Sequence, residues 1–264
     1  MTTAALPIPR RRARLSAYLP WHFRDFVAIG MLSAILFGLL GTAVIMQMHL
    51  AEASVAARVP GMVIPLAQKL EQFLTPYGMF AVVAPIICMT GLASQDRQLG
   101  YTRFLFAKPV SVRAYYLSLV AVRFVGFVLL GHILLLAYGH FEPPAYTWRF
   151  LVEMTVSFVA VGGIVFLLSV VSRYDGLFAV LWLLLATIIR ARFEAPGVGH
   201  LLTYLFPPIE HGDAVRRWAV SLNSIGELGA MDFPWKWMLW NGGYGLACLL
   251  MGLYLLRRIP LTKA

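Results

Sequence analysis

The amino-acid sequence predicts an all-α integral membrane protein with six transmembrane helices and both termini in the cytoplasm. The first indication is composition: 60% of the 264 residues are hydrophobic and 13% are charged, whereas soluble domains average about 45–50% and about 25%. The second is a series of apolar runs, most of them close to the roughly 20 residues that cross a bilayer. The third is an uneven distribution of Lys and Arg between the two sides.

Six apolar runs are the predicted spans. They form one bundle over residues 27–256, between a cytoplasmic N-terminal segment (1–26) and a cytoplasmic C-terminal tail (257–264). The fifth run is short unless it begins near Tyr174 and continues to Phe193, and it could instead feed a segment that re-enters the membrane from outside. The runs are Val27–Met48, Phe73–Ala93, Ala114–Tyr138, Phe150–Ser172, Leu177–Ile189 and Met238–Leu256.

The positions of the charged residues predict the orientation, since cytoplasmic loops carry the excess of Lys and Arg. With both ends inside, thirteen basic residues and three acids lie on the cytoplasmic side, against eight basic residues and nine acids outside. The cytoplasmic basic residues are Arg10, Arg11, Arg12, Arg14, Arg24, Arg97, Arg103, Lys108, Arg113, Arg173, Arg257, Arg258 and Lys263. An even number of spans agrees with the charge of every loop.

The formal net charge of +10 is explained by this topology and by attraction to anionic lipids, so no nucleic-acid partner is needed. The two cysteines, Cys88 and Cys248, sit inside apolar runs, so we expect neither a disulfide nor a zinc site. A cleaved signal peptide is disfavoured because the first apolar run starts only at Val27 and exceeds the roughly 7–15 residues of a signal core.

Aromatic and basic residues are mixed just before the first span, in the segment Leu15–Phe26. This composition favours a helix that lies in the plane of the membrane interface, with its apolar side toward the lipid. The alternative is an ordinary aromatic belt at the start of the first span.

The segment Ser94–Arg113, between the second and third spans, predicts a short amphipathic helix on the cytoplasmic face. Pro109 cannot continue such a helix, and Ser111 is placed to cap the third span. The alternative is a solvated connection with snorkelling arginines. One side of the helix is apolar and the other charged or polar: Leu99, Tyr101, Phe104 and Leu105 against Arg97, Gln98 and Arg103.

The longest connection, Arg190–Trp237, follows the fifth span. Loops of more than about 12–15 residues without secondary structure are uncommon. The apolar piece Val198–Phe206 and the amphipathic piece Asp213–Leu228 favour two short interfacial or re-entrant helices at the outer surface.

Two ionisable residues fall inside predicted spans. Arg123 lies ten positions after Arg113, about 15 Å into the third span at 1.5 Å per residue. An ionisable group at that depth is a functional-site candidate, and Glu153 in the fourth span is its natural partner. A structural ion pair, a substrate path lined by both residues, and snorkelling of Arg123 toward the cytoplasm remain open.

Glycine pairs and histidines have simpler interpretations. Gly162-Gly163 and Gly242-Gly243 are predicted to permit close helix packing. His132 is expected to pack between helices. The other histidines are scattered along the chain, and no metal site is expected from them.

The order of these features resembles the permease subunit of ABC-2-type exporters. After the second span, those permeases typically carry an acidic residue, a basic residue, a glycine, a threonine, an apolar helix and Pro-Val-Ser. The corresponding residues are Asp96, Arg97, Gly100, Thr102, Phe104-Leu105-Phe106 and Pro109-Val110-Ser111. The sequence departs from the pattern in three places: Asp96 replaces the commoner Glu, Tyr101 follows the glycine where Thr is frequent, and Leu119 stands where Lys is common.

The resemblance implies that the short helix docks into a cleft on a separate ATPase and passes its motion to the spans. It also implies a homo- or heterodimer of permeases in the cytoplasmic membrane, with the substrate path between the two halves. The chain has no G-x-x-x-x-G-K-[ST] motif, so ATP and Mg²⁺ are expected on the partner and no enzyme activity or cofactor in this chain. The implied coupling residues are Asp96, Arg97, Gly100, Thr102, Arg103, Phe104, Leu105, Lys108 and Pro109.

Three other classes are weighed against an exporter permease. A membrane-embedded enzyme is disfavoured because the spans contain no Ser/His pair, HExxH motif or acidic cluster. An ion-coupled carrier or channel needs several acids or broken helices at the midplane, where the sequence places only Arg123. A non-transporting membrane scaffold stays open. The resemblance does not name the substrate.

Overall fold

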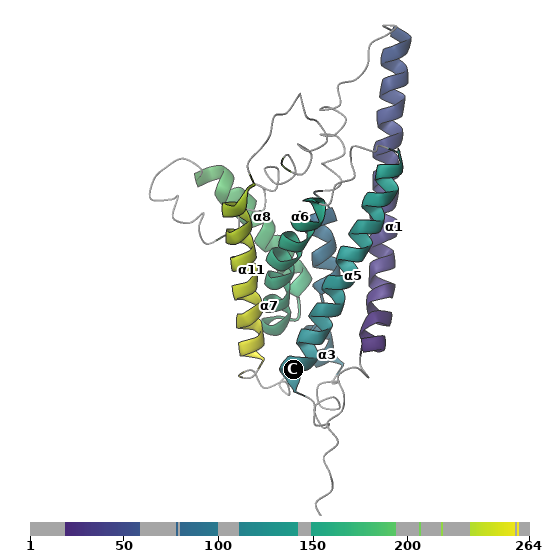
Figure 1. The fold of residues 1–264 in the computed structure, drawn as a ribbon. Helices are drawn as coiled ribbons and strands as arrows, with labels where there is room; N and C mark the ends of the chain where they lie inside the picture. The colour runs from purple at the N-terminus through teal and green to yellow at the C-terminus, as the bar shows by residue number, and fades with distance from the viewer. Residues whose placement is uncertain are drawn as a thin grey trace, which may run out of the picture.

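The computed structural model describes residues 19–58, 78, 80–99, 111–141, 149–193, 206, 218, 233–256 and 258. These residues are almost entirely helical and include no strand (Figure 1). Residues 80–89 are also helical. The elements are α1 (Leu19–Arg58), α3 (Ser94–Gln98), α5 (Val112–Phe141), α6 (Arg149–Ser157), the π-helix η3 (Phe158–Gly162), α7 (Gly163–Val171), α8 (Asp175–Phe193) and α11 (Trp235–Leu255).

Three helices among the described residues are long and apolar enough to cross a membrane: Val112–Ala137, Arg149–Val171 and Trp235–Leu255. They coincide with the predicted third, fourth and sixth spans, and they indicate a membrane protein. The predicted first and fifth spans lie within α1 and α8. The described part of the second is helical over residues 80–89.

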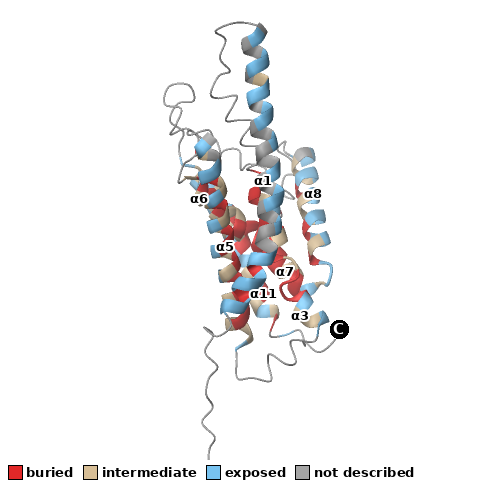
Figure 2. Cartoon of the chain, turned by 90° about the vertical axis from the view of Figure 1, so that its right-hand side faces the viewer, coloured by how far each residue is buried: buried red, intermediate tan, exposed pale blue. Residues whose placement is uncertain are grey.

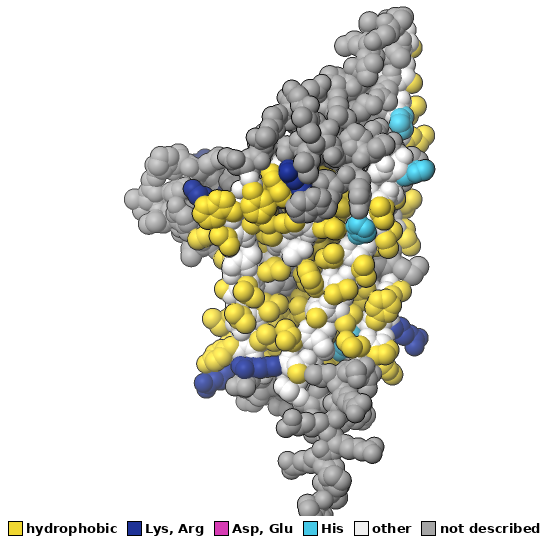
Figure 3. Space-filling view, viewed as in Figure 1, with side chains coloured by type: hydrophobic (Ala, Val, Ile, Leu, Met, Phe, Trp, Pro, Cys, Tyr) yellow, Lys and Arg dark blue, Asp and Glu magenta, His cyan; other side chains and the backbone are white. Residues whose placement is uncertain are grey.

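The surface of α5 shows which side of a spanning helix faces away from the protein. Val125, Leu129, Ile133 and Leu136 recur every three or four residues and are each half exposed or more. Buried residues lie between the helices and exposed ones on their outer sides (Figure 2). On the face drawn in Figure 3, apolar side chains cover the middle, with Lys and Arg toward the two ends. Because exposed leucines at helical spacing are costly in water, this face is suited to lipid.

The N-terminal region differs from its prediction. Residues 19–26 are the first two turns of α1, which continues without a break to Arg58, so the described part of the predicted interfacial helix lies on the axis of the first span. The only proline of α1, Pro20, occupies the first turn of the helix, where its missing N–H would have no partner within the helix. Residues 15–18 lie outside the described part of the chain.

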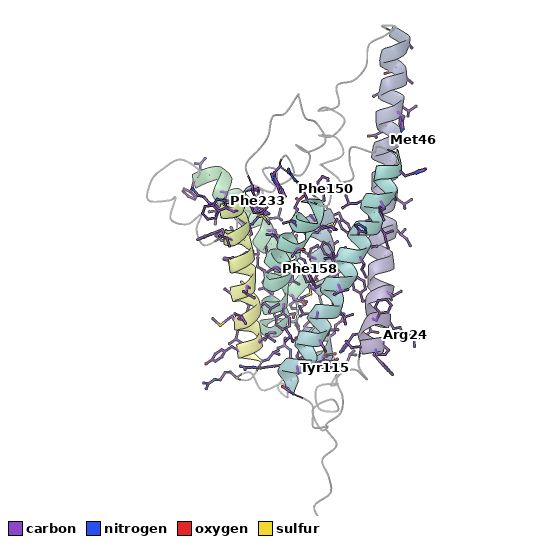
Figure 4. The ribbon with its side chains drawn as sticks, viewed as in Figure 1. Arg24, Met46, Tyr115, Phe150, Phe158 and Phe233 are labelled. Atoms are coloured by element: carbon purple, nitrogen blue, oxygen red, sulfur yellow. The ribbon has the colours of Figure 1, made fainter. Side chains whose placement is uncertain are left out.

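α1 packs against α5 and extends beyond it at one end (Figure 1). A Cβ atom added to Gly126 of α5 would lie 2.1 Å from the ring of Phe26, so the glycine is what admits this ring. This contact places the second turn of α1 against the middle of α5, and the ring of His22 lies 5.0 Å from that of Tyr115 near the start of α5. Arg24 and Tyr115 therefore lie at the same end of the bundle, opposite Phe150 and Phe233 (Figure 4).

α6, η3 and α7 form one spanning helix with a π-helical segment in the middle, at the point where α11 packs against it. Cβ atoms added to Gly163 and Gly245 would each lie about 2 Å from a backbone carbonyl oxygen across this contact. The packing role predicted for Gly163 is confirmed. Among the described residues, no atom lies within 4 Å of a Cβ at Gly242 or Gly243, so the packing role predicted for them is wrong within this chain, and Gly245 takes that role.

Candidate functional site

A tight turn connects helical residues 80–89 to α3. The helix ends at Thr90, whose backbone N–H and hydroxyl both donate to the carbonyl of Ile86, at 2.8 and 2.7 Å. Gly91 has φ +79°, the left-handed region that favours glycine, and a Cβ there would collide with the side chain of Gln95. The turn therefore redirects the chain so that α3 begins at Ser94.

Asp175, in the first turn of α8, binds this turn. Its Oδ2 accepts a hydrogen bond from the backbone N–H of Gly91 at 2.7 Å and one from the hydroxyl of Ser94 at 3.3 Å. The side chain of Asp175 is only 3% exposed. A carboxylate at a helix N-terminus is also favoured by the helix dipole. The first turn of α8 is thereby joined to the turn at Gly91, 84 positions earlier in the chain, and to the start of α3 at Ser94, 81 positions earlier.

Arg97 joins α3 to the end of α7. Its guanidinium donates to the carbonyls of Ser169 and Ser172, which belong to the last turn of α7 and the residue after it. Cations are favoured at helix C-termini, where carbonyls lack partners within the helix. The resemblance offered Arg97 as a contact for an ATPase, but here its guanidinium is bound inside the protein.

Asp96 joins α3 to α5. Its Oδ2 accepts a hydrogen bond from the hydroxyl of Tyr116 at 3.2 Å. Burial raises the pKa of Asp96 to about 6, and the Tyr116 hydrogen bond and the charge of Arg123 oppose this rise. With Asp175 and Arg97, this contact binds the turn and α3 to three helices: α5, α7 and α8. We call these three contacts the α3 clamp.

The raised pKa predicts how stability depends on pH. The folded protein holds the Asp96 proton more tightly than the unfolded chain, whose ordinary value is 3.8. The carboxyl therefore contributes stability that is complete below about pH 4 and is lost as pH rises through about 6. Asp96→Asn should remove this fall from the pH profile of the Tm, measured in detergent from pH 4 to 8. Identical profiles for the two proteins would contradict the assignment.

The other predicted coupling residues, Gly100, Thr102, Arg103, Phe104, Leu105, Lys108 and Pro109, lie outside the described residues. The chain is described again from Ser111, and α5 begins at Val112, one residue later. The carbonyl of Ser111 accepts a hydrogen bond from the N–H of Tyr115 at 3.0 Å. Ser111 therefore occupies the predicted N-cap position, immediately before the first residue of α5.

The structure gives the two intramembrane charges different surroundings. Arg123 is 6% exposed and donates to the carbonyl of Cys88. The carboxylates whose charges act on it are Asp25 and Asp96, at the cytoplasmic end of the predicted topology. Glu153 is 1% exposed and belongs to the first half of α6, toward the opposite end. The bond that the structure gives Arg123 is thus to the backbone of the second predicted span, and its pairing with Glu153 stays a prediction.

Two described residues of the long outer connection contact the spanning helices. The carbonyl of Phe206 accepts a hydrogen bond from Arg190 at 3.0 Å, and its ring lies 4.6 Å from that of Trp182, two turns earlier in α8. The carbonyl of Trp218 accepts from Arg149 at 2.7 Å. Phe206 therefore lies alongside α8, between the levels of residues 182 and 190, rather than beyond its end.

Among the described residues, no three His, Cys, Asp or Glu side chains gather as metal ligands would, and both cysteines are free thiols. Comparisons with protein-family models, with curated proteins and with solved structures found no match. The chemistry of the site is therefore argued from its own residues.

Proposed function

We propose that this chain is the permease subunit of an ATP-driven exporter, and that the cytoplasmic segment beginning at α3 receives motion from a separate ATPase. The observation that carries the proposal is the α3 clamp. A loop that only joined two spans would need no buried or half-buried polar bonds to three other helices. A segment that transmits force needs such bonds, because a solvated connection would bend instead of moving its neighbours.

The clamp distributes motion in three directions. A displacement of α3 pulls α8 through Asp175, α7 through Arg97 and α5 through Asp96 and Tyr116. Charge-assisted hydrogen bonds are stronger than neutral ones, and they hold the donor and acceptor in a fixed geometry. The part of the chain nearest the proposed ATPase is thereby connected to most of the bundle.

The six-span topology with cytoplasmic termini is part of this proposal. It is supported by the three apolar helices, by the helical state of α1, α8 and residues 80–89, and by the excess of basic residues in the loops assigned to the cytoplasm. The proposed partners are an ATPase that binds ATP and Mg²⁺, a second permease copy and anionic lipid. Arg123 and Glu153, both buried in spanning helices, are our candidates for the substrate path.

Association with the ATPase is tested by purifying the full-length chain from its native membranes. Phe104→Asp combined with Leu105→Asp should abolish co-purification of an ATPase, because charges would replace the apolar ridge expected to fill its cleft. Arg97→Gln is the matched variant, since Arg97 binds inside the protein and association should persist. Equal recovery of the ATPase with the unaltered chain, the Phe104→Asp/Leu105→Asp variant and the Arg97→Gln variant would overturn the proposed docking segment.

Transmission is a separate expectation. With the ATPase still bound, Arg97→Gln should lower substrate-stimulated ATP hydrolysis by about tenfold, roughly the loss of one 1.4 kcal/mol interaction in the transmitting state. Unchanged stimulation in this variant would show that the contact with α7 does not carry the motion.

An ion-coupled carrier is the second candidate, and one observation favours it. Burial raises the pKa of Asp96 to about 6, against the Tyr116 hydrogen bond and the charge of Arg123, so the carboxyl is suited to exchange a proton at the membrane edge. The chain alone, reconstituted in vesicles with a pH gradient, would then move protons. An exporter permease without its ATPase would not.

A further inference from the structure

α1 carries a row of apolar side chains that stays exposed along much of the helix. The buried residues near its start, His22 and Phe26, pack against Tyr115 and Gly126 of α5. The row lies on a different side of α1, and each of its large residues is more than half exposed. In chain order these are Leu32, Leu36, Leu39, Met46 and Leu50. The described part of the chain therefore leaves this row uncovered.

Three alanines complete the row as a heptad repeat. Ala43, Ala53 and Ala57 are exposed like the larger residues, and with them the steps along the row alternate between four and three residues. This is the spacing of the a and d positions of a coiled coil, whereas contact with lipid requires no fixed spacing. From Leu32 to Ala57 the repeat covers about 38 Å of helix at about 1.5 Å per residue. We call these eight residues the α1 seam.

α1 extends well beyond the helix on which it packs. The contacts of His22 with Tyr115 and of Phe26 with Gly126 follow the same order along both helices, so α1 and α5 run in the same direction. α1 continues for 32 residues after Phe26 and α5 for 15 after Gly126, which leaves the end of α1 about 25 Å beyond that of α5 (Figure 1). The 40 residues of α1 measure about twice the roughly 30 Å of the hydrocarbon core. Lipid tails therefore cannot cover the whole seam.

The outer part of α1, from Met46 onward, distinguishes a helical partner from lipid. The seam residues there are apolar, and the exposed residues beside them are polar: Gln47, His49 and Ser54. These three occupy the e and g positions that flank the seam. Apolar a and d positions between polar e and g positions are typical of a helix that pairs with another helix in water. The occupant that this pattern favours is therefore a second helix.

We propose that the α1 seam pairs with the α1 seam of a second copy of this chain, as a parallel, in-register coiled coil. Two copies inserted in the same orientation bring their α1 helices together in parallel, and a two-fold axis along the membrane normal places each seam residue opposite its counterpart. The seam residues are all uncharged, so the pairing requires no complementary charge from a different protein. Its alanines let the two helices approach closely. The second copy is a partner in the proposed function, so the inference rests on that part of it, but it involves no ATPase.

Disulfide formation between copies, measured in native membranes, tests the pairing. Single cysteines are introduced into the full-length chain after Cys88→Ala and Cys248→Ala. Met46→Cys and Ala53→Cys should give covalent dimers on mild oxidation, because d side chains of a parallel pair meet across its axis. Gln47→Cys and Ser54→Cys are the matched controls, since each is exposed and adjacent to a seam position. They should give about fivefold less dimer, because flank side chains lie too far apart for a disulfide without backbone movement.

Three outcomes would overturn the seam. Equal dimer yields at seam and flank positions would indicate random collision, a covalent product of another mass would indicate a different protein, and no dimer from any position would leave the row to lipid and solvent. Light scattering by the unaltered chain in detergent separates this failure from that of the proposed function. A dimer without the seam pattern overturns the seam alone, whereas the seam pattern in a chain that never co-purifies with an ATPase leaves the seam intact and contradicts the permease.

Discussion

Gly245→Val is expected to prevent α11 from packing against the spanning helix α6–η3–α7. A Cβ at this position would lie 2.0 Å from the carbonyl oxygen of Val159 and 2.5 Å from the Cα of Ala160. Backbone atoms cannot rotate away as a side chain would, so the helices must separate. The loss should exceed about 3 kcal/mol, the usual limit for overpacked cores, and little monodisperse protein should survive extraction.

Gly242→Ala and Gly243→Ala are the controls, because both positions are open. Each should leave the yield unchanged or stabilise the helix by up to about 1 kcal/mol, the difference in helix propensity between alanine and glycine. Size-exclusion profiles and the Tm in detergent compare the three variants. A well-folded Gly245→Val protein would mean that α11 does not approach η3 as closely as the structure shows.

Asp175→Ala is expected to release the turn before α3 and to lower the free energy of unfolding by about 2–4 kcal/mol. The change removes a buried acceptor and leaves the N–H of Gly91 without its partner, which costs more than the hydrogen bond itself. Asp175→Asn keeps one acceptor oxygen, so its loss should be smaller. Ser94→Ala removes only the 3.3 Å bond and should lose about 1 kcal/mol or less.

The test is the order of the stability losses, measured as Tm values of the purified variants. Asp175→Ala should lose most, Asp175→Asn less, and Ser94→Ala about 1 kcal/mol or less. Protease accessibility of the segment after α3 provides a second readout, since only loss of the clamp should increase it. Ser94→Ala and Asp175→Ala proteins of equal stability would contradict the assignment of Asp175 as the main anchor.

The predicted third, fourth and sixth spans, which coincide with the three long apolar helices, were predictable because membrane crossing depends on a local property. A run of apolar residues such as Val112–Ala137 must form a helix in lipid whatever surrounds it. The first helix shows the limit of local patterns. Aromatic and basic residues before Val27 are typical of an interfacial helix, but Pro20 lies in the first turn of α1, where it does not interrupt the helix, so residues 19–26 continue directly into the span.

The glycines show a different limit. A sequence identifies glycines that could permit close packing, but it does not give the rotation of the helix about its axis. Gly242, Gly243 and Gly245 are therefore equivalent in the sequence. Only the packing of α11 on η3 and α7 separates the glycine at the contact from the two that face open space.

The candidate site was half predictable. Asp96 and Arg97 stand out by their position after the second span, but their partners Tyr116, Ser169 and Ser172 follow from the fold alone. In the sequence, Asp175 stands out only as one of the three acids assigned to the cytoplasmic side, with Asp25 and Asp96. An acid followed by glycine at the start of a helix was the available signal, and it gives no indication of a partner 84 residues away.

The central claim is that the segment beginning at α3 couples this chain to an ATPase. Its most direct test is ATP hydrolysis by the full-length chain purified from native membranes, with and without Phe104→Asp and Leu105→Asp. The permease assignment predicts that an ATPase activity co-purifies with the unaltered chain and is lost with the altered one. A chain that purifies without any ATPase, yet moves ions or protons in vesicles by itself, would contradict it.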